Sequence, residues 1–122
     1  MADALACWNE EFGKLLGLKI TRDADGCLQD IHWSIGDLGY FPTYTLGSLN
    51  AAQLMHRATL DHPSLESELA RGQYGALLAW LREKVHRHGQ RYRPQHLMEQ
   101  ATGEPTRAGY CLDHLRRNFA GE

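Results

Sequence analysis

The residues best suited to chemistry lie in the stretch CLQDIHWSIGDLGYFPTYTL, residues 27–46. Asp30 and His32 are two residues apart, and alternate side chains of an extended segment point the same way, so the carboxylate is placed to hold the imidazole in one tautomer. An imidazole held in this way can bind a carboxylate or stabilise an oxyanion. A purely structural role fits equally, with Asp30 capping a helix and His32 packing on Trp33, and the sequence alone leaves both interpretations open.

Two tyrosines extend this candidate site. The hydroxyl groups of Tyr40 and Tyr44 either reach a ligand or find polar partners at the edge of a core. Gly36, Gly39 and Pro42 interrupt the same stretch, which favours an irregular segment over a regular helix or strand. The residue types thus leave two roles open for Asp30, His32, Tyr40 and Tyr44: contact with a ligand, or a purely structural role.

The seven histidines do not form a recognisable metal motif. Zinc sites often place two imidazoles on one helix face as H-E-x-x-H, and no such motif occurs in this chain. His86 and His88 are two residues apart, which on a helix is about 200° around the axis and directs the rings apart. They suit solvated positions near a helix C-terminus. We expect no metal ligands in this chain, and a small metal-binding protein built on this pair ranks last among the hypotheses.

Nucleophilic catalysis also lacks a signature. The G-x-S-x-G nucleophile motif is not present. Cys27 is near His32 in the sequence, but a free cysteine is usually a small buried residue. Cys7, Cys27 and Cys111 are odd in number and have no C-x-x-C spacing, which predicts reduced thiols and a cytoplasmic location. The N-terminus has no basic region followed by an apolar run, so we expect no export signal.

The charge is unevenly distributed. Residues 1–70 hold 4 Lys/Arg against 10 Asp/Glu, and residues 71–122 hold 9 against 5. The basic run from Arg82 to Arg93 is interleaved with aromatic residues, as in some nucleic-acid sites, but it alternates around a helix and continues beyond its end. We interpret it as a solvated face or a partner for the acidic half, and expect neither nucleic-acid nor membrane binding.

Helical periodicity and helix-end signals predict an all-α fold, with about five helices in a single domain, 1–122, and an irregular segment at 17–41. The first helix spans about 3–16. Pro42 suits the first turn of the second, which runs to about Leu60. Three further helices are expected: one with the stripe Leu77, Leu78, Leu81 and Val85, ended by Gly89; one from Pro94 to Gly103; and one with the closing stripe Ala108, Cys111, Leu112, Leu115 and Phe119.

The helix after Pro42 has features of an element that is buried on more than one side. It carries small residues on one face and apolar residues around the others: Gly47, Ser48, Ala51 and Ala52, then Leu46, Leu49, Leu54 and Met55. Few other helices are available in a chain of this length to cover it. We therefore expect the chain to form a two-fold homodimer through residues 44–55.

The motif Gly26-x-x-Gln29-Asp30-x-His32-Trp33, followed by GYFPTYTLG at 39–47, resembles the signature of the M32 metallopeptidases, the carboxypeptidase Taq family. The similarity continues through AAQL, ARGQY, LLAWLREKVHRHG and ATGEP, so it covers essentially the whole chain. It covers only the C-terminal part of the family's sequence.

The resemblance implies a function. Members of the family are cytoplasmic, largely helical and often dimeric, and they release single residues from peptide C-termini with a divalent metal such as zinc or cobalt. The metal is held by an H-E-x-x-H helix and a later glutamate, both upstream of the region that this chain resembles. We expect a truncated C-terminal segment that holds no cofactor and is inactive alone, in which Asp30, His32, Tyr40 and Tyr44 would face the peptide substrate in the full-length context. The alternative is a stand-alone helical protein-interaction module.

Overall fold

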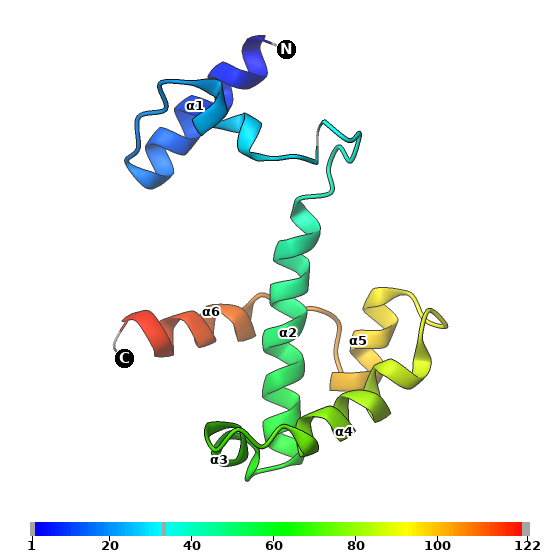
Figure 1. Cartoon of the computed structure of the whole chain (residues 1–122). Helices are drawn as coiled ribbons and strands as arrows, with labels where there is room; N and C mark the ends of the chain where they lie inside the picture. Colours follow the sequence, from blue (N-terminus) through cyan, green and yellow to red (C-terminus); the bar gives the residue numbers. More distant parts are fainter. Residues whose placement is uncertain (1, 33, 121–122) are drawn as a thin grey trace. The chain divides into compact units, whose positions relative to one another are not determined.

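The computed structural model describes residues 2–32 and 34–120, and it confirms the all-α prediction (Figure 1). No strand occurs in the described residues. The α-helices are α1 (Ala2–Leu16), α2 (Pro42–Asp61), α3 (Leu65–Ala70), α4 (Gly75–Lys84), α5 (Pro94–Thr102) and α6 (Gly109–Leu115). Short 3-10 turns cover Asp23–Asp25, Cys27–Gln29 and His86–His88, and a π-helical turn, Arg116–Ala120, continues α6.

The chain divides into two compact units, Met1–Pro42 and Thr43–Glu122. Each unit is described by itself. The expectation of one domain over residues 1–122 stays a prediction.

The first unit places two 3-10 turns against α1. Gly26 is buried between these turns, and a Cβ atom there would come within 2.8 Å of Ile20 Cγ2 and 3.0 Å of Asn9 Oδ1. No side chain fits in that space without a shift of its neighbours. Cys27, which follows, is only 2% exposed. The first residue of the sequence motif is therefore a glycine because the backbone approaches α1 closely at that point.

The second unit is arranged around α2 (Figure 1). Helices α3 and α4 lie near its C-terminal end, and α5 and α6 lie to either side of it in this view. Pro94 stands in the first turn of α5, and Gly103 ends that helix in the left-handed conformation with φ 92°, as its sequence signals indicate. The buried residues of this unit come from α2, α3 and α5: Gln53, Ala58, Leu65, Met98 and Ala101.

One detail differs from the sequence predictions, because helix α3 was not expected. The apolar stripe of α6 leaves Leu112 49%, Leu115 45% and Phe119 81% exposed. Helix α2 was expected to carry more apolar surface than a chain of this length can cover, and its buried residues are only Gln53 and Ala58. This chain therefore does not cover all of its apolar helix faces.

None of the described helices combines the length and the apolar character that a membrane crossing requires.

Candidate functional site

Asp30 and His32 form a paired site in the first unit. Asp30 follows the turn Cys27–Gln29 with extended backbone angles, φ −84° and ψ 108°. One carboxylate oxygen, Oδ1, accepts a hydrogen bond from the backbone N–H of His32 at 2.9 Å and also contacts His32 Nδ1. The side chains are 7% and 16% exposed, respectively. The two-residue spacing therefore brings the carboxylate and the imidazole together, which is one of the two arrangements that the sequence left open.

This pairing lowers the pKa of Asp30 and orients the ring of His32. The two hydrogen bonds from His32, first from its backbone and then from its ring, lower the pKa of Asp30 below its ordinary value. An ionised carboxylate only accepts hydrogen bonds, so a ring proton lies on Nδ1. In the neutral imidazole Nε2 is then an acceptor, and only the imidazolium donates from both nitrogens. Binding of an anion through Nε2 would therefore require the charged ring.

Two aromatic rings hold the imidazole of His32. Tyr40 stacks on it with ring centroids 5.2 Å apart and an interplanar angle of 21°, and Phe41 meets it edge-on at 5.9 Å. The alternative packing of His32 on Trp33 lies outside the described residues. The structure thus brings Asp30, His32 and Tyr40 into one cluster. The ring is fixed by a carboxylate on one side and by aromatic packing on another, which is the pre-organisation that a binding group needs.

Tyr44 belongs to the second unit and is described by itself. It lies in the first turn of α2 with 55% of its surface exposed. Its carbonyl oxygen accepts a hydrogen bond from Ser48 Oγ at 3.1 Å.

The remaining motif residue, Gln29, has a structural contact. Its amide Nε2 donates to the carbonyl of Ala24 and so joins the two 3-10 turns that precede Asp30. The motif therefore combines two residues that shape the backbone, Gly26 and Gln29, with two that form the polar pair. The sequence alone does not show which motif residues shape the backbone and which form the polar pair.

The described residues offer no metal centre. No group of three or more His, Cys, Asp or Glu side chains in the described ranges is placed to hold an ion. His86 is exposed, while His88 is half-buried with its ring 5.3 Å from that of Tyr92. A divalent metal therefore does not fit the donor set of this part of the chain, and no chemistry is derived through one.

A Ser–His–Glu cluster beside α3 resembles a hydrolytic triad in composition only. Ser64 Oγ donates to Glu68 Oε1 at 2.8 Å, and His62 Nε2 lies 3.0 Å from the same oxygen and 3.2 Å from Ser64 Oγ. A triad needs the serine and the acid on opposite ring nitrogens. Here both contact Nε2, so the cluster cannot activate Ser64. These contacts instead hold the first turn of α3 and lower the pKa of Glu68.

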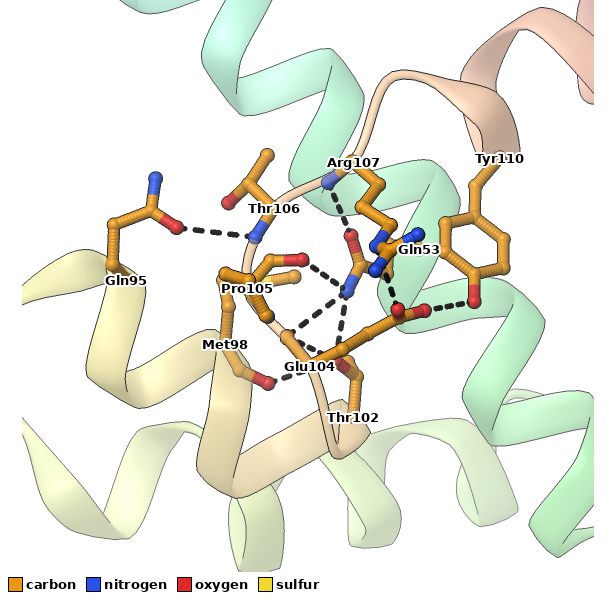
Figure 2. A network of polar contacts seen from close by, with 9 residues as sticks. All are labelled: Gln53, Gln95, Met98, Thr102, Glu104, Pro105, Thr106, Arg107 and Tyr110. Carbon is orange, nitrogen blue, oxygen red and sulfur yellow. Dashed lines mark hydrogen bonds and ion pairs between the residues drawn. The ribbon is translucent and has the colours of Figure 1, made fainter.

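A polar network that the sequence did not reveal lies in the second unit (Figure 2). Gln53, on α2, is 1% exposed. Its Nε2 lies 2.9 Å from Thr102 Oγ1, 3.2 Å from the Glu104 carbonyl and 3.1 Å from the Pro105 carbonyl. Its Oε1 accepts from the Arg107 backbone N–H at 2.9 Å. One amide therefore contacts Glu104, Pro105 and Arg107 in the loop between α5 and α6, while Gln95 and Asn50 hold Thr106.

The outer part of this network surrounds Glu104. Its carboxylate accepts from the Tyr110 hydroxyl and pairs with Arg107 Nε at 2.8 Å (Figure 2). The hydrogen bond to Glu104 raises the pKa of Tyr110. The only sequence signal for this network is a single amide, in AAQL, on an otherwise apolar and small helix face.

Comparisons with known proteins identify relatives over almost the full chain. A family model described as carboxypeptidase Taq (M32) metallopeptidase matches residues 1–119. The chain is 41% identical over 118 residues to carboxypeptidase 1 of Bacillus subtilis, covering 97% of this chain and 24% of that protein. It is 42% identical over 112 residues to thermostable carboxypeptidase 1 of Pyrococcus furiosus, covering 92% of this chain and 22% of that protein.

Solved structures agree with these matches. The crystal structure of an M32 carboxypeptidase from Deinococcus radiodurans R1 superposes with a TM-score of 0.91 at 40% identity, covering 98% of this chain and 24% of the other. Metallocarboxypeptidase 1 of Trypanosoma cruzi gives 0.91 at 38% identity, covering 98% and 25%. The chain thus spans about a quarter of the length of the relatives it matches.

Proposed function

The chain belongs to the carboxypeptidase Taq (M32) metallopeptidase family, and on that premise we propose that it supplies part of the substrate-binding wall of a metal-dependent carboxypeptidase. The Asp30–His32 pair supports this proposal most directly. The imidazole ring of His32, oriented by Asp30 and stacked on Tyr40, would in its charged form suit the C-terminal carboxylate of a peptide, or the oxyanion that develops when its last peptide bond is attacked. By resemblance, Tyr44 is proposed as a further substrate-binding residue of the full-length enzyme.

The remaining chemistry lies outside this chain. By resemblance, the family holds zinc or cobalt through an H-E-x-x-H helix and a glutamate, which this sequence does not contain. The chain alone is therefore proposed to be inactive, as a C-terminal quarter of the enzyme that completes a site built by the other three quarters. A single domain over residues 1–122, a cytoplasmic location and a homodimeric assembly belong to the same proposal. The free thiols Cys7, Cys27 and Cys111 are consistent with a reducing compartment.

A chimera tests the role of the pair. Residues 1–119 of this chain replace the matching segment of the B. subtilis relative, and release of the C-terminal residue from a blocked dipeptide is measured with zinc or cobalt. We expect turnover by the chimera and none by the 122-residue chain. The substitution His32→Ala should lower kcat/KM about 100-fold, because a donor to developing charge contributes about 3 kcal/mol.

The matched control is His86→Ala, which removes an exposed imidazole outside the cluster and should leave kcat/KM unchanged. An unchanged kcat/KM for His32→Ala in an active, folded chimera would show that His32 has only a structural role. Metal-dependent turnover by the isolated chain, surviving repurification and abolished by a chelator, would contradict the proposed division of the enzyme. Activity in neither form would favour the alternative of a stand-alone helical interaction module.

A further inference from the structure

Phe41 is a half-exposed aromatic residue that contacts the candidate site. It keeps 55% of its surface in solvent, so its burial contributes less to stability than that of a core phenylalanine. Its ring meets the imidazole of His32 with centroids 5.9 Å apart and an interplanar angle of 82°. This geometry lies within the range of favourable perpendicular aromatic pairs. Burial alone is therefore a weak reason for an aromatic residue at this position.

The backbone between His32 and Phe41 turns back on itself. The N–H of Asp37 donates to the carbonyl of His32 at 2.8 Å, and the N–H of Tyr40 donates to the carbonyl of Asp37 at 3.2 Å. Gly39 lies within the second turn with φ 77°, a conformation that residues with a side chain rarely adopt. The proline that starts α2 restricts the backbone of Phe41. The local sequence therefore returns the ring of Phe41 to the imidazole.

The contact between His32 Nδ1 and Asp30 Oδ1 does not by itself fix the direction of Nε2. A hydrogen bond stays favourable over deviations of about 30° from linearity. A binding group, in contrast, must be held to within about 10–20° of its productive geometry. The imidazole therefore needs a further constraint that the carboxylate does not supply.

Tyr40 and Phe41 constrain the imidazole in different directions. The ring of Tyr40 is nearly parallel to it, at 21°, and the ring of Phe41 is nearly perpendicular to it, at 82°. A stacked ring alone tolerates sliding, because offset arrangements are favourable over a range of centroid distances. A second ring in a perpendicular plane limits movement that the stacked ring permits. The carboxylate and the two rings together therefore define the plane of the imidazole and the direction of Nε2.

We propose that Phe41 is a positioning residue of the Asp30–His32 pair, whose ring holds the imidazole in the plane that directs Nε2 toward an anionic group of the substrate. In this role Phe41 acts through His32 and not by contact with the substrate. The inference rests on the proposed function, in which His32 meets a carboxylate or an oxyanion. It adds an apolar residue to a site that the sequence defined by polar side chains.

Kinetics of the chimera described above test this role. Phe41→Leu keeps an apolar side chain but removes the ring, so kcat/KM should fall about 10-fold, less than for His32→Ala because the imidazole is still present. Phe41→Tyr keeps the ring and should leave kcat/KM close to that of the parent chimera. An unchanged kcat/KM for Phe41→Leu, or equal losses for the leucine and tyrosine variants, would overturn the proposal.

A double-mutant cycle shows whether Phe41 acts through His32. In a chimera that already carries His32→Ala, adding Phe41→Leu should cause no further loss of kcat/KM, since no imidazole remains to be oriented. The same loss in both backgrounds would mean that Phe41 acts independently, which would overturn this inference and leave the proposed function standing. If His32→Ala has no effect on kcat/KM, the proposed function fails and this inference fails with it.

Proton exchange in the 122-residue chain separates positioning from a general effect on folding. The Nδ1 proton and the backbone N–H of His32 both meet Asp30 Oδ1, but only the first depends on the orientation of the ring. In NMR spectra, Phe41→Leu should speed solvent exchange of the ring proton about 10-fold and leave exchange of the backbone N–H unchanged. Equal rates for the ring proton in variant and parent would contradict the proposed role.

The matched control is Phe12→Leu, which removes an aromatic ring of the same unit outside the site. Phe12 stacks on Trp8 within α1, with ring centroids 5.8 Å apart. Its loss should therefore speed backbone exchange in α1 more than exchange of the His32 ring proton. Loss of backbone protection throughout the first unit in Phe41→Leu would show that Phe41 holds the fold, and would overturn the positioning role.

Discussion

Gln53 shows how one buried side chain can organise a loop distant in sequence. Its amide group meets the backbone or side chains of residues 49 to 54 positions away, including Thr102 and Arg107. Buried polar groups are stable only when hydrogen-bonded, and here both ends of the amide have partners. The loop in turn carries Glu104, which binds Tyr110 at the start of α6. Gln53 therefore sets the position from which α6 departs.

The first prediction follows from this arrangement. Replacing the amide in Gln53→Leu removes the partner of the Arg107 N–H and of the loop carbonyls, so the free energy of unfolding should fall by about 3 kcal/mol. Urea denaturation followed by circular dichroism measures the change. Gln100→Leu is the control, since Gln100 is exposed and contacts His96 at 3.3 Å, and its effect should stay within about 0.5 kcal/mol. Similar small decreases in the free energy of unfolding for Gln53→Leu and Gln100→Leu would mean that other contacts hold the loop.

At the scale of elements, α2 and α4 are joined by one carboxylate. Asp61, in the last turn of α2, accepts from Trp80 Nε1 at 2.9 Å and pairs with Arg57 at 2.7 Å. The bond from Trp80, and then that from Arg57, lower the pKa of Asp61. In the unfolded chain Asp61 has an ordinary Asp pKa of about 3.9. As the pH falls, it therefore binds a proton at a higher pH in the unfolded chain than in the folded chain. The stability that Asp61 provides is fully present above its pKa in the unfolded chain, about 3.9. It is lost as the pH falls through the lower pKa of Asp61 in the folded chain.

This linkage predicts the behaviour of Asp61→Asn. The variant should be less stable than the parent at pH 7, and the difference should shrink as the pH falls below about 4. Urea unfolding at pH 7, 5 and 3.5 measures it. Asp30 and Glu68, whose pKa values are also lowered, should leave the variant with some acid sensitivity. Asp113→Asn, in an exposed pair with Arg116, is the control and should change little at any pH. A difference between Asp61→Asn and the parent that does not depend on pH would contradict the assignment.

The elements also show what a sequence can predict. Pro42, Pro94 and Gly103 act within their own turns, so the ends of α2 and α5 were predicted closely. Helix α3 was missed because six residues are too few to establish a period. The contact between Asp30 and His32 could be anticipated as one of two arrangements because it is local. The Gln53 network was missed because its partners are distant in the sequence. The stripe on α6 was identified as apolar, but its exposure could not be predicted because periodicity identifies a face and not what covers it.

For the whole molecule, the absence of a three-ligand cluster in the described residues leads to a prediction about metal. Zinc should bind the 122-residue chain weakly and without a defined stoichiometry, since a zinc site needs three or four converging ligands. Isothermal titration calorimetry measures the binding, with His86→Ala and His88→Ala as the comparison variants. A one-to-one site with submicromolar affinity for zinc that either substitution removes would support the hypothesis of a metal-binding protein built on His86 and His88.

The isolated chain should also associate with itself. Residues 44–55 of α2 include Leu46, which is 50% exposed, and Met55, which lines a groove between α2 and α6. With no other chain to cover this region, a two-fold dimer is the simplest contact that closes it, so light scattering at tens of micromolar should give twice the monomer mass. Leu49→Glu or Met55→Glu should weaken the dimer, whereas Leu78→Glu on α4 should not. A monomeric mass with cooperative unfolding would show that the chain covers its own apolar surface.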